Sequence, residues 1–436
     1  MKEIKVGLIG FGTVGAGVVK LLSENAALIQ QKMGARLTLK KVADLDITSD
    51  RGVTVAPGLL TTSAGEVLND PEIAIVIELI GGYEPARSFV LGAINSGKHV
   101  VTANKALLAV HGEEIFAAAA AKGVEVLFEP AVGGGIPVLS AIRGNLAANR
   151  FSSVLGILNG TCNYILTRMT DEGAEFATVL TTAQELGYAE ADPTFDVEGI
   201  DTAHKLCLLV SLCFGAKMKL ADVHTEGISS LSPVDIVFAR EFGYKIKLLA
   251  IGKCDGERIE ARVHPTMIPL RYPLADVDGV FNAIRLVGDF VGPVMFIGRG
   301  AGMNPTASAV VGELVDISRN IVAGIGRRIA PMGYLDDAVT TIPLKPMGEI
   351  VSKYYLRFSA VDRPKVLSRI AGVLGDYGIS IESMIQNTRS DRESVPIVIM
   401  THAAREADVR TALERIDTLE IITEKTHLIR IEDNLE

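Results

Sequence analysis

The sequence predicts an α/β fold that opens with a doubly wound parallel sheet and continues into two further parts. Strand-like apolar runs alternate with helix-like stretches over residues 1–132, and this order is typical of a parallel sheet with helices on both faces. A glycine-rich turn follows the first apolar run. The chain of 436 residues is long enough for two or three domains of ordinary size.

The first part is expected to form a dinucleotide-binding domain over residues 1–132. Its first strand covers 4–10, where IKVGLIG is apolar throughout, as in a strand buried on both faces. A helix then begins within the glycine-rich turn. Further strands are expected at 37–44, 74–80, 99–103 and 124–129, and helices at 85–96 and 105–121.

The middle of the chain is less regular and is expected to form a separate α+β domain over 133–299. Helices are expected near 136–147 and 198–214, and a strand at 245–254. Over 299–320 a glycine turn leads into a helix with the composition of a segment returning to a nucleotide site. We therefore expect about 300–335 to complete the first domain.

Residues 336–352 are predicted to be a linker, and residues 353–436 a compact C-terminal domain. Strands are expected at 354–361, 378–386, 395–400 and 420–432, with one helix starting at Pro364 and another over 404–416. This β-α-β-β-α-β order is the ferredoxin-like pattern.

Composition excludes several classes of function. Lys and Arg number 43 against 52 Asp and Glu, a net charge of −9 without a basic block, so neither nucleic acid nor an anionic membrane is an expected partner. Four cysteines without a CxxC pair favour a reducing compartment and exclude a disulfide framework or a structural zinc site. The N-terminus lacks a signal-peptide layout, and the longest apolar stretch, 206–216, is too short to span a bilayer. We expect a soluble cytoplasmic protein.

The glycine-rich turn is a GxGxxG motif that predicts dinucleotide binding by a Rossmann-type sheet. It follows an apolar strand and opens a helix, and its residues are Gly10, Phe11, Gly12, Thr13, Val14 and Gly15. The glycines permit a tight turn and close backbone approach, and the helix N-terminus attracts pyrophosphate.

Asp44, at the end of the second predicted strand, favours NAD over NADP. A carboxylate there accepts hydrogen bonds from the ribose 2′-hydroxyl and repels a 2′-phosphate. Asp44 lies 29 residues beyond Gly15, whereas the usual spacing is about 20. Two alternatives stay open: Asp44 is a solvated turn residue, or Arg51 takes the phosphate of NADP.

Two lysines are candidates for the reacting centre. Lys105 follows the strand at 99–103, at the carboxyl edge where ligands of parallel sheets bind. Asp201 and Lys205 share one face of the helix at 198–214, just before it becomes wholly apolar. The alternatives are a solvated lysine and a surface ion pair. Five acids within residues 190–201, beside a lysine entering a core helix, better suit a zwitterionic substrate. His204 is expected to be structural.

Taken together, the motifs resemble those of the homoserine dehydrogenase family over essentially the whole chain. They are GFGTVG (10–15), ELIGG (78–82), TANK (102–105), GGGIP (133–137), LNGTCNYIL (158–166), LGYAEADP (186–193) with the acids and lysine that follow, and GAGMNPTASAVV (300–311). The resemblance implies reversible reduction of L-aspartate 4-semialdehyde to L-homoserine with NAD or NADP, on the route to threonine, isoleucine and methionine.

The resemblance also assigns roles to individual residues. It makes Lys205 the proton donor to the carbonyl oxygen and Lys105 a second catalytic lysine. Glu190 and Asp201 hold the substrate's amino group and hydroxyl end, and Tyr188 and Asp196 belong to the same substrate motif. The implied cofactor contacts include Phe11, Thr13, Val14, Thr102, Lys105 and Gly302. A monovalent cation, sodium, is implied at Glu129, Val132, Gly134 and Ile136, where hard oxygen ligands suit such an ion; a structural turn is the alternative.

Two departures from the family pattern stand out. Leu45 or Asp44 occupies the place just after the second strand where many relatives carry an arginine, which weakens an expectation of NADP. Cys162 replaces the usual threonine of LNGTCN. A cysteine there raises the alternative of a phosphorylating semialdehyde dehydrogenase with a thiol nucleophile. A non-catalytic sensor of amino acids and NAD is the alternative outside the enzymes.

The C-terminal domain resembles an ACT domain, through AVDRPKVLSRIAGVLGDYGISIESMIQ (360–386). The resemblance implies a small amino-acid effector, threonine, held near Asp362, Arg363, Lys365, Val366 and Gly378. The alternative is a module that serves only oligomerisation. The family resemblance further implies that the domain over 133–299 serves substrate binding and dimerisation, in a homodimer or a homotetramer.

Overall fold

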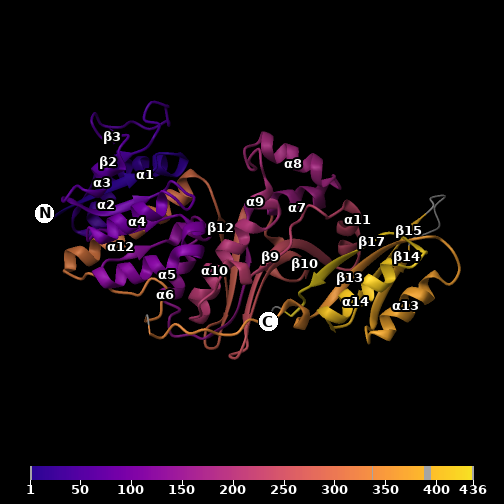
Figure 1. Cartoon of the computed structure of the whole chain (residues 1–436). Coiled ribbons are helices and arrows are strands. Elements are labelled where there is room, and N and C mark those ends of the chain that lie inside the picture. The colour runs from indigo at the N-terminus through magenta and orange to yellow at the C-terminus, as the bar shows by residue number, and fades with distance from the viewer. Residues whose placement is uncertain (1, 336, 387–393, 435–436) are drawn as a thin grey trace.

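The computed structural model describes residues 2–335, 337–386 and 394–434, which form three parts in a row (Figure 1). Residue 336 of the predicted linker and residues 387–393 and 435–436 of the predicted C-terminal domain lie outside the described residues. In the part that the structure describes, no helix is long and apolar enough to cross a membrane.

The first part is a six-stranded parallel sheet in the order β3-β2-β1-β4-β5-β6, and it confirms the predicted fold class. The strands are β1 (Glu3–Ile9), β2 (Arg36–Ala43), β3 (Leu60–Thr61), β4 (Ile73–Glu78), β5 (His99–Thr102) and β6 (Val126–Leu127). The helices are α1 (Thr13–Glu24), α2 (Ala26–Met33), α3 (Ala64–Leu68), α4 (Ala86–Asn95) and α5 (Lys105–Lys122).

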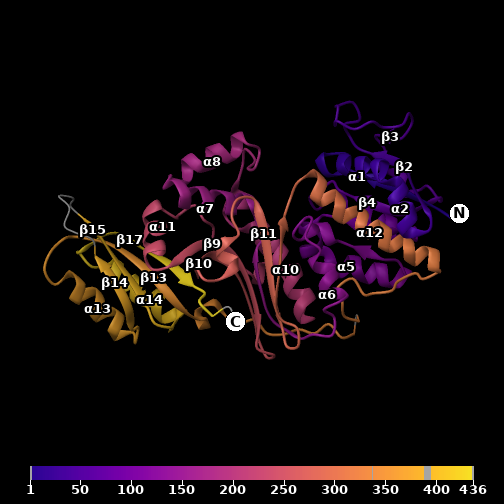
Figure 2. The same cartoon turned by 180° about the vertical axis from the view of Figure 1, so that it is seen from behind.

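Helices cover both faces of the sheet, so that a central strand buries side chains on each face. In β5, Val101 packs in the core that contains α1, whereas Val100 packs in the core that contains α4 and α5. The later helix α12 (Met303–Ala323) joins the α1 face, as Figure 2 shows from behind. At their crossing a Cβ on Gly17 would lie 2.7 Å from Met303, so glycine permits this close packing.

Two predicted elements of the first part are shorter than expected for local reasons. The strand predicted at 124–129 is only β6, because Glu129 and Pro130 start the short 3-10 helix η1 (Glu129–Ala131) and proline has no N–H for a ladder. The strand predicted at 74–80 ends at Glu78, whose carboxylate accepts hydrogen bonds from the amides of Ile80 and Gly81.

The middle part packs helices against a largely antiparallel sheet. Its strands are β7 (Phe151–Ile157), β8 (His224–Thr225), β9 (Tyr244–Cys254), β10 (Ile259–Pro269), β11 (Phe281–Gly288) and β12 (Gly292–Arg299). Its helices are α6 (Val138–Arg143), α7 (Gly160–Glu172), α8 (Phe176–Glu185), α9 (Thr194–Val197), α10 (Ile200–Phe214) and α11 (Pro233–Glu241), with the 3-10 turns η2 (Leu220–Asp222) and η3 (Pro273–Asp276). Helix α6 is shorter than the predicted 136–147 and ends at Arg143, directly before Gly144. Helix α10 is buried along most of its length and runs beside β9 and β10.

The C-terminal part has the predicted β-α-β-β-α-β order, with strands arranged as β17-β13-β15-β14. Its elements are β13 (Val351–Ala360), α13 (Val366–Asp376), β14 (Ile381–Gln386), β15 (Val395–Thr401), β16 (Ala404–Arg405), α14 (Glu406–Asp417) and β17 (Ile422–Ile431). The turn η4 (Met347–Glu349) and the start of β13 both fall within residues predicted as linker.

The middle and C-terminal sheets are continuous. Strand β17 pairs with β10 in parallel, through Thr266 with Arg430 and Met267 with Ile431, and the result is a sheet of 11 strands. The C-terminal domain is therefore joined to the middle domain by backbone hydrogen bonds as well as by side chains.

Candidate active site

A buried ion pair opens helix α10. The helix starts after Gly199, whose φ of +79° suits glycine, and Asp201 and Lys205 follow one turn apart on the same face. The Nζ of Lys205 lies 2.5 Å from Oδ2 of Asp201 and donates a second hydrogen bond to the carbonyl oxygen of Leu158 at 2.7 Å. Asp201 is 4% and Lys205 8% exposed, so this pair is not the surface pair that the sequence left open.

Lys105 reaches the same carboxylate from the first domain. It is the first residue of α5, directly after the strand end at β5, and its Nζ lies 3.0 Å from Oδ1 of Asp201. Its side chain is 30% exposed. The structure thus brings together the two lysines, one at the edge of the parallel sheet and one within the middle domain, on the two oxygens of one acid.

Asn159 completes the cluster, and sequence reasoning gave it no role. Its amide nitrogen donates to Oδ1 of Asp196 at 2.7 Å and to Oδ2 of Asp201 at 3.0 Å. Its amide oxygen accepts from the backbone N–H of Cys162 at 2.8 Å and so caps helix α7. Asn directly before the helix start is a capping signal readable in the sequence, but the bridge to the two acids depends on the tertiary fold.

The charges of the cluster shift one another's pKa values. Burial raises the pKa of Asp201, but Lys205 and Lys105 outweigh burial and hold it below the ordinary value. Burial, together with the charge of Lys105, lowers the pKa of Lys205, and Asp201 offsets part of that effect. Burial raises the pKa of Asp196, against the hydrogen bond from Asn159.

This arrangement can hold and protonate an oxygen atom. An ammonium group has three N–H donors, and two of those on Lys205 go to Leu158 and Asp201 among the described residues. The third is available to a ligand oxygen. A buried cation next to a developing alkoxide stabilises it and can supply the proton.

The other predicted substrate residues lie near this cluster in the chain but make no described contact with its lysines. Glu190 is exposed, and its backbone oxygen accepts from Gln184. Tyr188 is 44% exposed, and its ring packs edge to face against that of Tyr164, with the ring centroids 5.0 Å apart. His204, expected to be structural, is buried, and its Nδ1 lies 2.9 Å from the carbonyl oxygen of Ile200.

The dinucleotide turn has the close approaches that its glycines predict. Gly10 has a φ of +105°, and a Cβ on Gly15 would lie 2.1 Å from the carbonyl oxygen of Gly10. Helix α1 begins at Thr13 after Gly12, and no side chain caps it, so the amides of Thr13, Val14 and Gly15 at its first turn are available to an anion. These residues fit a pyrophosphate.

Asp44 shapes this turn. Its Oδ2 accepts from the backbone N–H of Phe11, and its Oδ1 accepts from that of Asp46 at 2.9 Å. Arg51, the alternative partner for a 2′-phosphate, instead pairs with Asp46 at 3.1 Å. Asp44 is thus bound to the glycine-rich turn and is not merely a solvated turn residue.

Glu78 links the end of β4 to the end of β5. Sequence reasoning gave this residue no role of its own. It is fully buried, and its Oε2 accepts from the hydroxyl of Thr102 at 2.6 Å, while its Oε1 accepts from the amide of Ile80. Burial raises the pKa of Glu78. The Thr102 hydroxyl in turn accepts from the amide of Asn104, the cap of α5. Glu78 therefore fixes the loop that presents Lys105.

The segment 300–305 lies against the GGGIP loop. A Cβ on Gly134 would lie 2.4 Å from the carbonyl oxygen of Gly300, so this turn and the GGGIP loop are in direct backbone contact. Gly302 has a φ of +113° and precedes the first turn of α12.

The residues predicted to hold a cation form a buried turn around Glu129. Its Oε1 and Oε2 accept from the backbone amides of Leu139 and Ser140 at 2.8 and 2.6 Å. Burial raises the pKa of Glu129, against the nearby charge of Arg143. The carbonyl oxygen of Ile136 accepts from Val138, whereas no described backbone donor bonds the carbonyls of Val132 and Gly134. Among the residues that the structure describes, no cluster of three or more His, Cys, Asp or Glu side chains could hold a metal.

Cys162 lacks the features of a nucleophile. It is fully buried, and its thiol lies 3.2 Å from the carbonyl oxygen of Asp196. Burial raises the pKa of Cys162 well above its usual range, and Asp196 and Asp201 add to that effect. A thiolate is the reactive form, so the structure disfavours the phosphorylating alternative.

The predicted effector residues flank the start and end of helix α13. Lys365 precedes the helix with a φ of +76°, an uncommon conformation for a residue other than glycine. Asp362, Arg363 and Lys365 are exposed, Val366 is buried, and Gly378 follows the helix with a φ of +70°.

Comparisons with known proteins relate the whole chain to one family. The family model of the homoserine dehydrogenase NAD-binding domain matches residues 10–129, the homoserine dehydrogenase model matches 137–315, and the ACT domain model matches 354–420. Homoserine dehydrogenases of Pseudomonas aeruginosa and Synechocystis are each 45% identical to it, over 99% and 98% of this chain and 99% of each relative. The crystal structure of a homoserine dehydrogenase from Thiobacillus denitrificans superposes with a TM-score of 0.93 at 49% identity, covering 99% of both chains.

Proposed function

Because the chain belongs to the homoserine dehydrogenase family, it is a nicotinamide-dependent oxidoreductase of amino-acid biosynthesis, and we propose that its reaction takes place at the Asp201 cluster. The reaction interconverts L-aspartate 4-semialdehyde and L-homoserine. The observation that carries the assignment is the meeting of Lys105 and Lys205 on the two oxygens of buried Asp201.

Lys205 is the proposed proton donor. A bound nicotinamide cofactor supplies hydride to the aldehyde carbon, or accepts it in the reverse direction. As negative charge develops on the carbonyl oxygen, the third N–H of Lys205 stabilises it and passes the proton. Asp201 and the Leu158 carbonyl hold the Lys205 ammonium in place. Lys105 adds a second positive charge at the more open side of the cluster.

Acidic groups are proposed to bind the substrate's amino end. Asp196 is half-buried next to Asn159, and Glu190 lies on the exposed loop just before α9. A protonated amino group needs such carboxylates for charge-assisted hydrogen bonds. Replacing Glu190 by Gln is expected to raise the KM for homoserine about tenfold or more with a smaller change in kcat. An unchanged KM would remove Glu190 from the substrate site.

The cofactor is proposed to bind over the glycine-rich turn, with NAD favoured over NADP. Asp44 supports the preference because it places a carboxylate at the end of β2, bonded to the turn itself. Initial rates with homoserine, measured with NAD⁺ and NADP⁺ in parallel, test the preference. A higher kcat/KM with NADP⁺ would overturn the role given to Asp44 while leaving the enzyme assignment intact.

A sodium ion is proposed beside the GGGIP loop. The support is a carboxylate oxygen of Glu129 together with the Val132 and Gly134 carbonyls, which accept no described backbone hydrogen bond. Both Glu129 oxygens already accept amide hydrogen bonds, so the ion would share their remaining lone pairs. Thermal unfolding in sodium chloride and in choline chloride at equal ionic strength tests the site. Equal unfolding temperatures in the two salts would mean that these residues form a structural turn that binds no sodium.

Threonine is the proposed effector of the ACT domain. The support is an exposed turn at residues 362–365 at the start of α13, where backbone groups and charged side chains adjoin. Saturating threonine is expected to lower the rate or the affinity for homoserine, and no change in either would discard the proposal. The assembly is proposed to be a homodimer or a homotetramer, which light scattering at several concentrations distinguishes from a monomer.

A further inference from the structure

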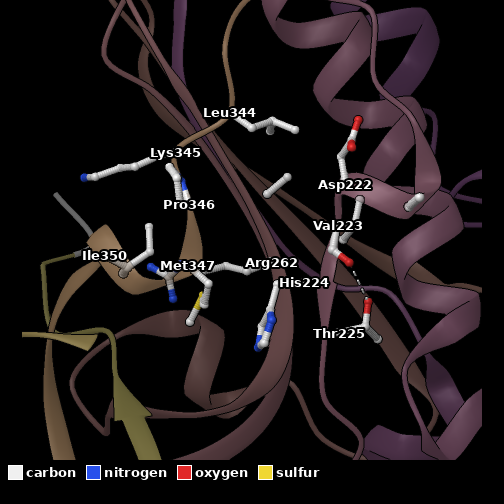
Figure 3. Close-up of a pocket in the computed structure, with 12 residues that line it drawn as sticks. Asp222, Val223, His224, Thr225, Arg262, Leu344, Lys345, Pro346, Met347 and Ile350 are labelled. Atoms are coloured by element: carbon white, nitrogen blue, oxygen red, sulfur yellow. Dashed lines mark hydrogen bonds between the residues drawn. The ribbon is translucent and has the colours of Figure 1, made fainter. Parts of the chain in front are cut away.

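A cavity of about 500 Å³ lies away from the Asp201 cluster, where the middle domain meets the chain that leads into the ACT domain (Figure 3). Its volume falls within the range of small-molecule sites, roughly 300–1,000 Å³. One side is formed by η2 and β8, the floor by β10, and the other side by residues 344–350. None of these residues belongs to the site described above.

The walls of the cavity are fixed by backbone hydrogen bonds. Strand β8 pairs with β10, with His224 opposite Arg262. The crossing chain is bound to the start of β10, because Ile259 donates to the carbonyl of Pro343 at 2.9 Å and Lys345 donates to the carbonyl of Ile259 at 2.8 Å. The cavity is therefore a built feature of the fold.

Arg262 lines the cavity and carries an unsatisfied donor. It is 3% exposed, and its Nε–H has no hydrogen-bond partner among the described residues. The two terminal nitrogens are occupied: Nη1 bonds His264 at 2.8 Å and Nη2 bonds Glu432 at 3.1 Å. Figure 3 shows Arg262 between His224 and the Met347 side of the cavity. A buried N–H without a partner costs free energy that a ligand acceptor would recover.

Arg262 belongs to a network of ion pairs at the edge of the cavity. Arg262 and Lys253 share Glu432, at 3.1 and 2.7 Å, and Arg262 and Lys345 share Glu260, at 3.6 and 3.0 Å. These pairs join three cations and two carboxylates, and Asp222 is a third acid on the lining of the cavity. The Nε–H of Arg262 stays outside this network, and a ligand carboxylate would make a charge-assisted hydrogen bond with it.

The remaining lining is mostly apolar on the side of the crossing chain. Leu344, Pro346, Met347 and Ile350 form it, with Val223 and Ala261 nearby. An aliphatic body would bury its surface against these side chains. Asp222 lies at the opposite rim (Figure 3), where it would accept from an amino group if the ligand carries one.

We propose that this cavity binds a small carboxylate with an aliphatic body, in addition to the substrate and cofactor. The acid end lies at Arg262 and the aliphatic end against Met347. The amide of Glu406, at the start of α14, donates to the carbonyl of Ile350 at 2.8 Å, so the occupied cavity would touch the middle domain and the segment that leads into the ACT domain at once.

Titration calorimetry of the full-length protein with three probes tests the proposal. Isocaproate carries the acid and the aliphatic body, its amide lacks the charge, and L-leucine adds the amino group. We expect saturable binding of isocaproate or L-leucine, with the amide weaker by at least about tenfold because it cannot pair with Arg262. The stronger of the two acids then shows whether Asp222 takes an amino group.

Two variants at Met347 locate the binding. Met347→Trp fills the cavity and Met347→Glu places a repelling carboxylate in it, and each is expected to weaken binding by about tenfold or more. Met384, half-exposed on β14 and outside the cavity, provides the matched controls Met384→Trp and Met384→Glu, which should bind as the parent does. Undiminished homoserine oxidation shows that each variant is folded.

Three results would overturn the proposal. The first is that neither isocaproate nor L-leucine binds saturably. The others are equal binding of isocaproate and its amide, and binding that neither Met347 variant weakens.

Discussion

At the scale of single residues, Asn159 shows how one uncharged side chain can position two acids. It donates to Asp196 and Asp201, and each hydrogen bond opposes the effect of burial, which raises the pKa of both acids. We predict that Asn159→Ala lowers kcat by about tenfold to a hundredfold and moves the acidic limb of the pH profile upward, since each carboxylate loses a hydrogen bond to its charged form.

The pH profile separates this positioning role from a merely structural one. Asn149→Ala removes a half-buried amide that bonds Leu146 and Val291, away from the cluster, and should leave the profile unchanged. An Asn159→Ala enzyme with parental kcat and an unmoved acidic limb would contradict the role given to Asn159.

A second prediction at this scale concerns the charge of Lys105. That charge lowers the pKa of Lys205. In the proposed mechanism homoserine oxidation needs Lys205 deprotonated as the base, so the rate is expected to rise with pH through the pKa of Lys205. Lys105→Ala removes the nearby positive charge, raises the pKa of Lys205 and should move this rise to higher pH. A rise at the parental pH would show that the two lysines are not electrostatically coupled, and a rise at a lower pH would contradict the predicted direction of the effect.

The helical part of this site could be predicted from the sequence, but the bridging part could not. Asp201 and Lys205 share a face because helical periodicity dictates it. The contact with Lys105 joins two domains, so only the resemblance suggested it. Glu78 and Asn159 act through hydrogen bonds to distant segments, and no local pattern encodes those partners.

At the scale of elements, the turn at Gly134 shows that backbone contact requires glycine. Gly134 has a φ of +56°, and a Cβ there would lie 2.4 Å from the carbonyl oxygen of Gly300. We predict that Gly134→Ala lowers the free energy of unfolding by about 1–3 kcal/mol and raises the KM for the cofactor, because the 300–305 segment must shift.

Gly312 is the matched control for that prediction. It is exposed on α12, and a Cβ there meets nothing within 4 Å. Gly312→Ala should therefore stabilise the protein by about 0.5–1 kcal/mol. Denaturant unfolding of the two variants measures both effects, and equal stabilities would refute the close-contact argument.

Element boundaries were predictable where the apolar pattern is continuous and failed where a turn interrupts it. Strand β9 (Tyr244–Cys254) was expected at 245–254 and helix α10 at 198–214. Strands β10, β11 and β12 were not predicted individually. Their pairing is antiparallel and long-range, and its stability comes from cross-strand contacts that the local sequence does not reveal.

At the scale of the whole molecule, a buried ion pair joins the ACT domain to the middle domain. Arg357 on β13 bonds Asp235 at the start of α11, at 2.6 Å, and Tyr355 donates to the same carboxylate at 3.0 Å. Asp235 is fully buried. We predict that Asp235→Asn lowers the free energy of unfolding by about 3–5 kcal/mol, because it leaves the Arg357 charge buried without its partner.

The surface pair between Arg415 and Asp376 is the control. Both side chains are more than half exposed, so Asp376→Asn should cost less than about 1 kcal/mol. Calorimetric unfolding of both variants compares them. Similar losses of unfolding free energy would mean that the Asp235–Arg357 pair does not stabilise the contact between the two domains.

The ion pair between Asp235 and Arg357 also predicts a loss of stability in acid. Burial raises the pKa of Asp235, but Arg357 outweighs it and the pKa lies below the ordinary 3.8. A carboxylate with a lowered pKa in the folded state stabilises that state above its unfolded pKa. In the parent this contribution to stability should disappear as the pH falls below about 4. Asp235→Asn lacks the carboxylate, so its stability should fall less over the same pH range. Parallel stability curves for the two proteins would contradict this.

The continuity of the two sheets could not be predicted at this scale. The order of elements indicated a ferredoxin-like C-terminal domain, and the structure has it. The parallel contact of β17 with β10 involves only two residue pairs between segments far apart in the sequence. Such a short contact leaves no periodic signal in either strand.

The proposed mechanism depends on Lys205, which transfers the proton to or from the substrate oxygen. The most direct test is homoserine-dependent reduction of the nicotinamide cofactor by Lys205→Ala, beside the exposed-lysine control Lys217→Ala. Calorimetric cofactor binding is measured on the same samples. We predict a fall in kcat of about a hundredfold to ten-thousandfold for Lys205→Ala with cofactor affinity retained, and parental behaviour for Lys217→Ala. Turnover by Lys205→Ala at the parental rate would contradict the claim.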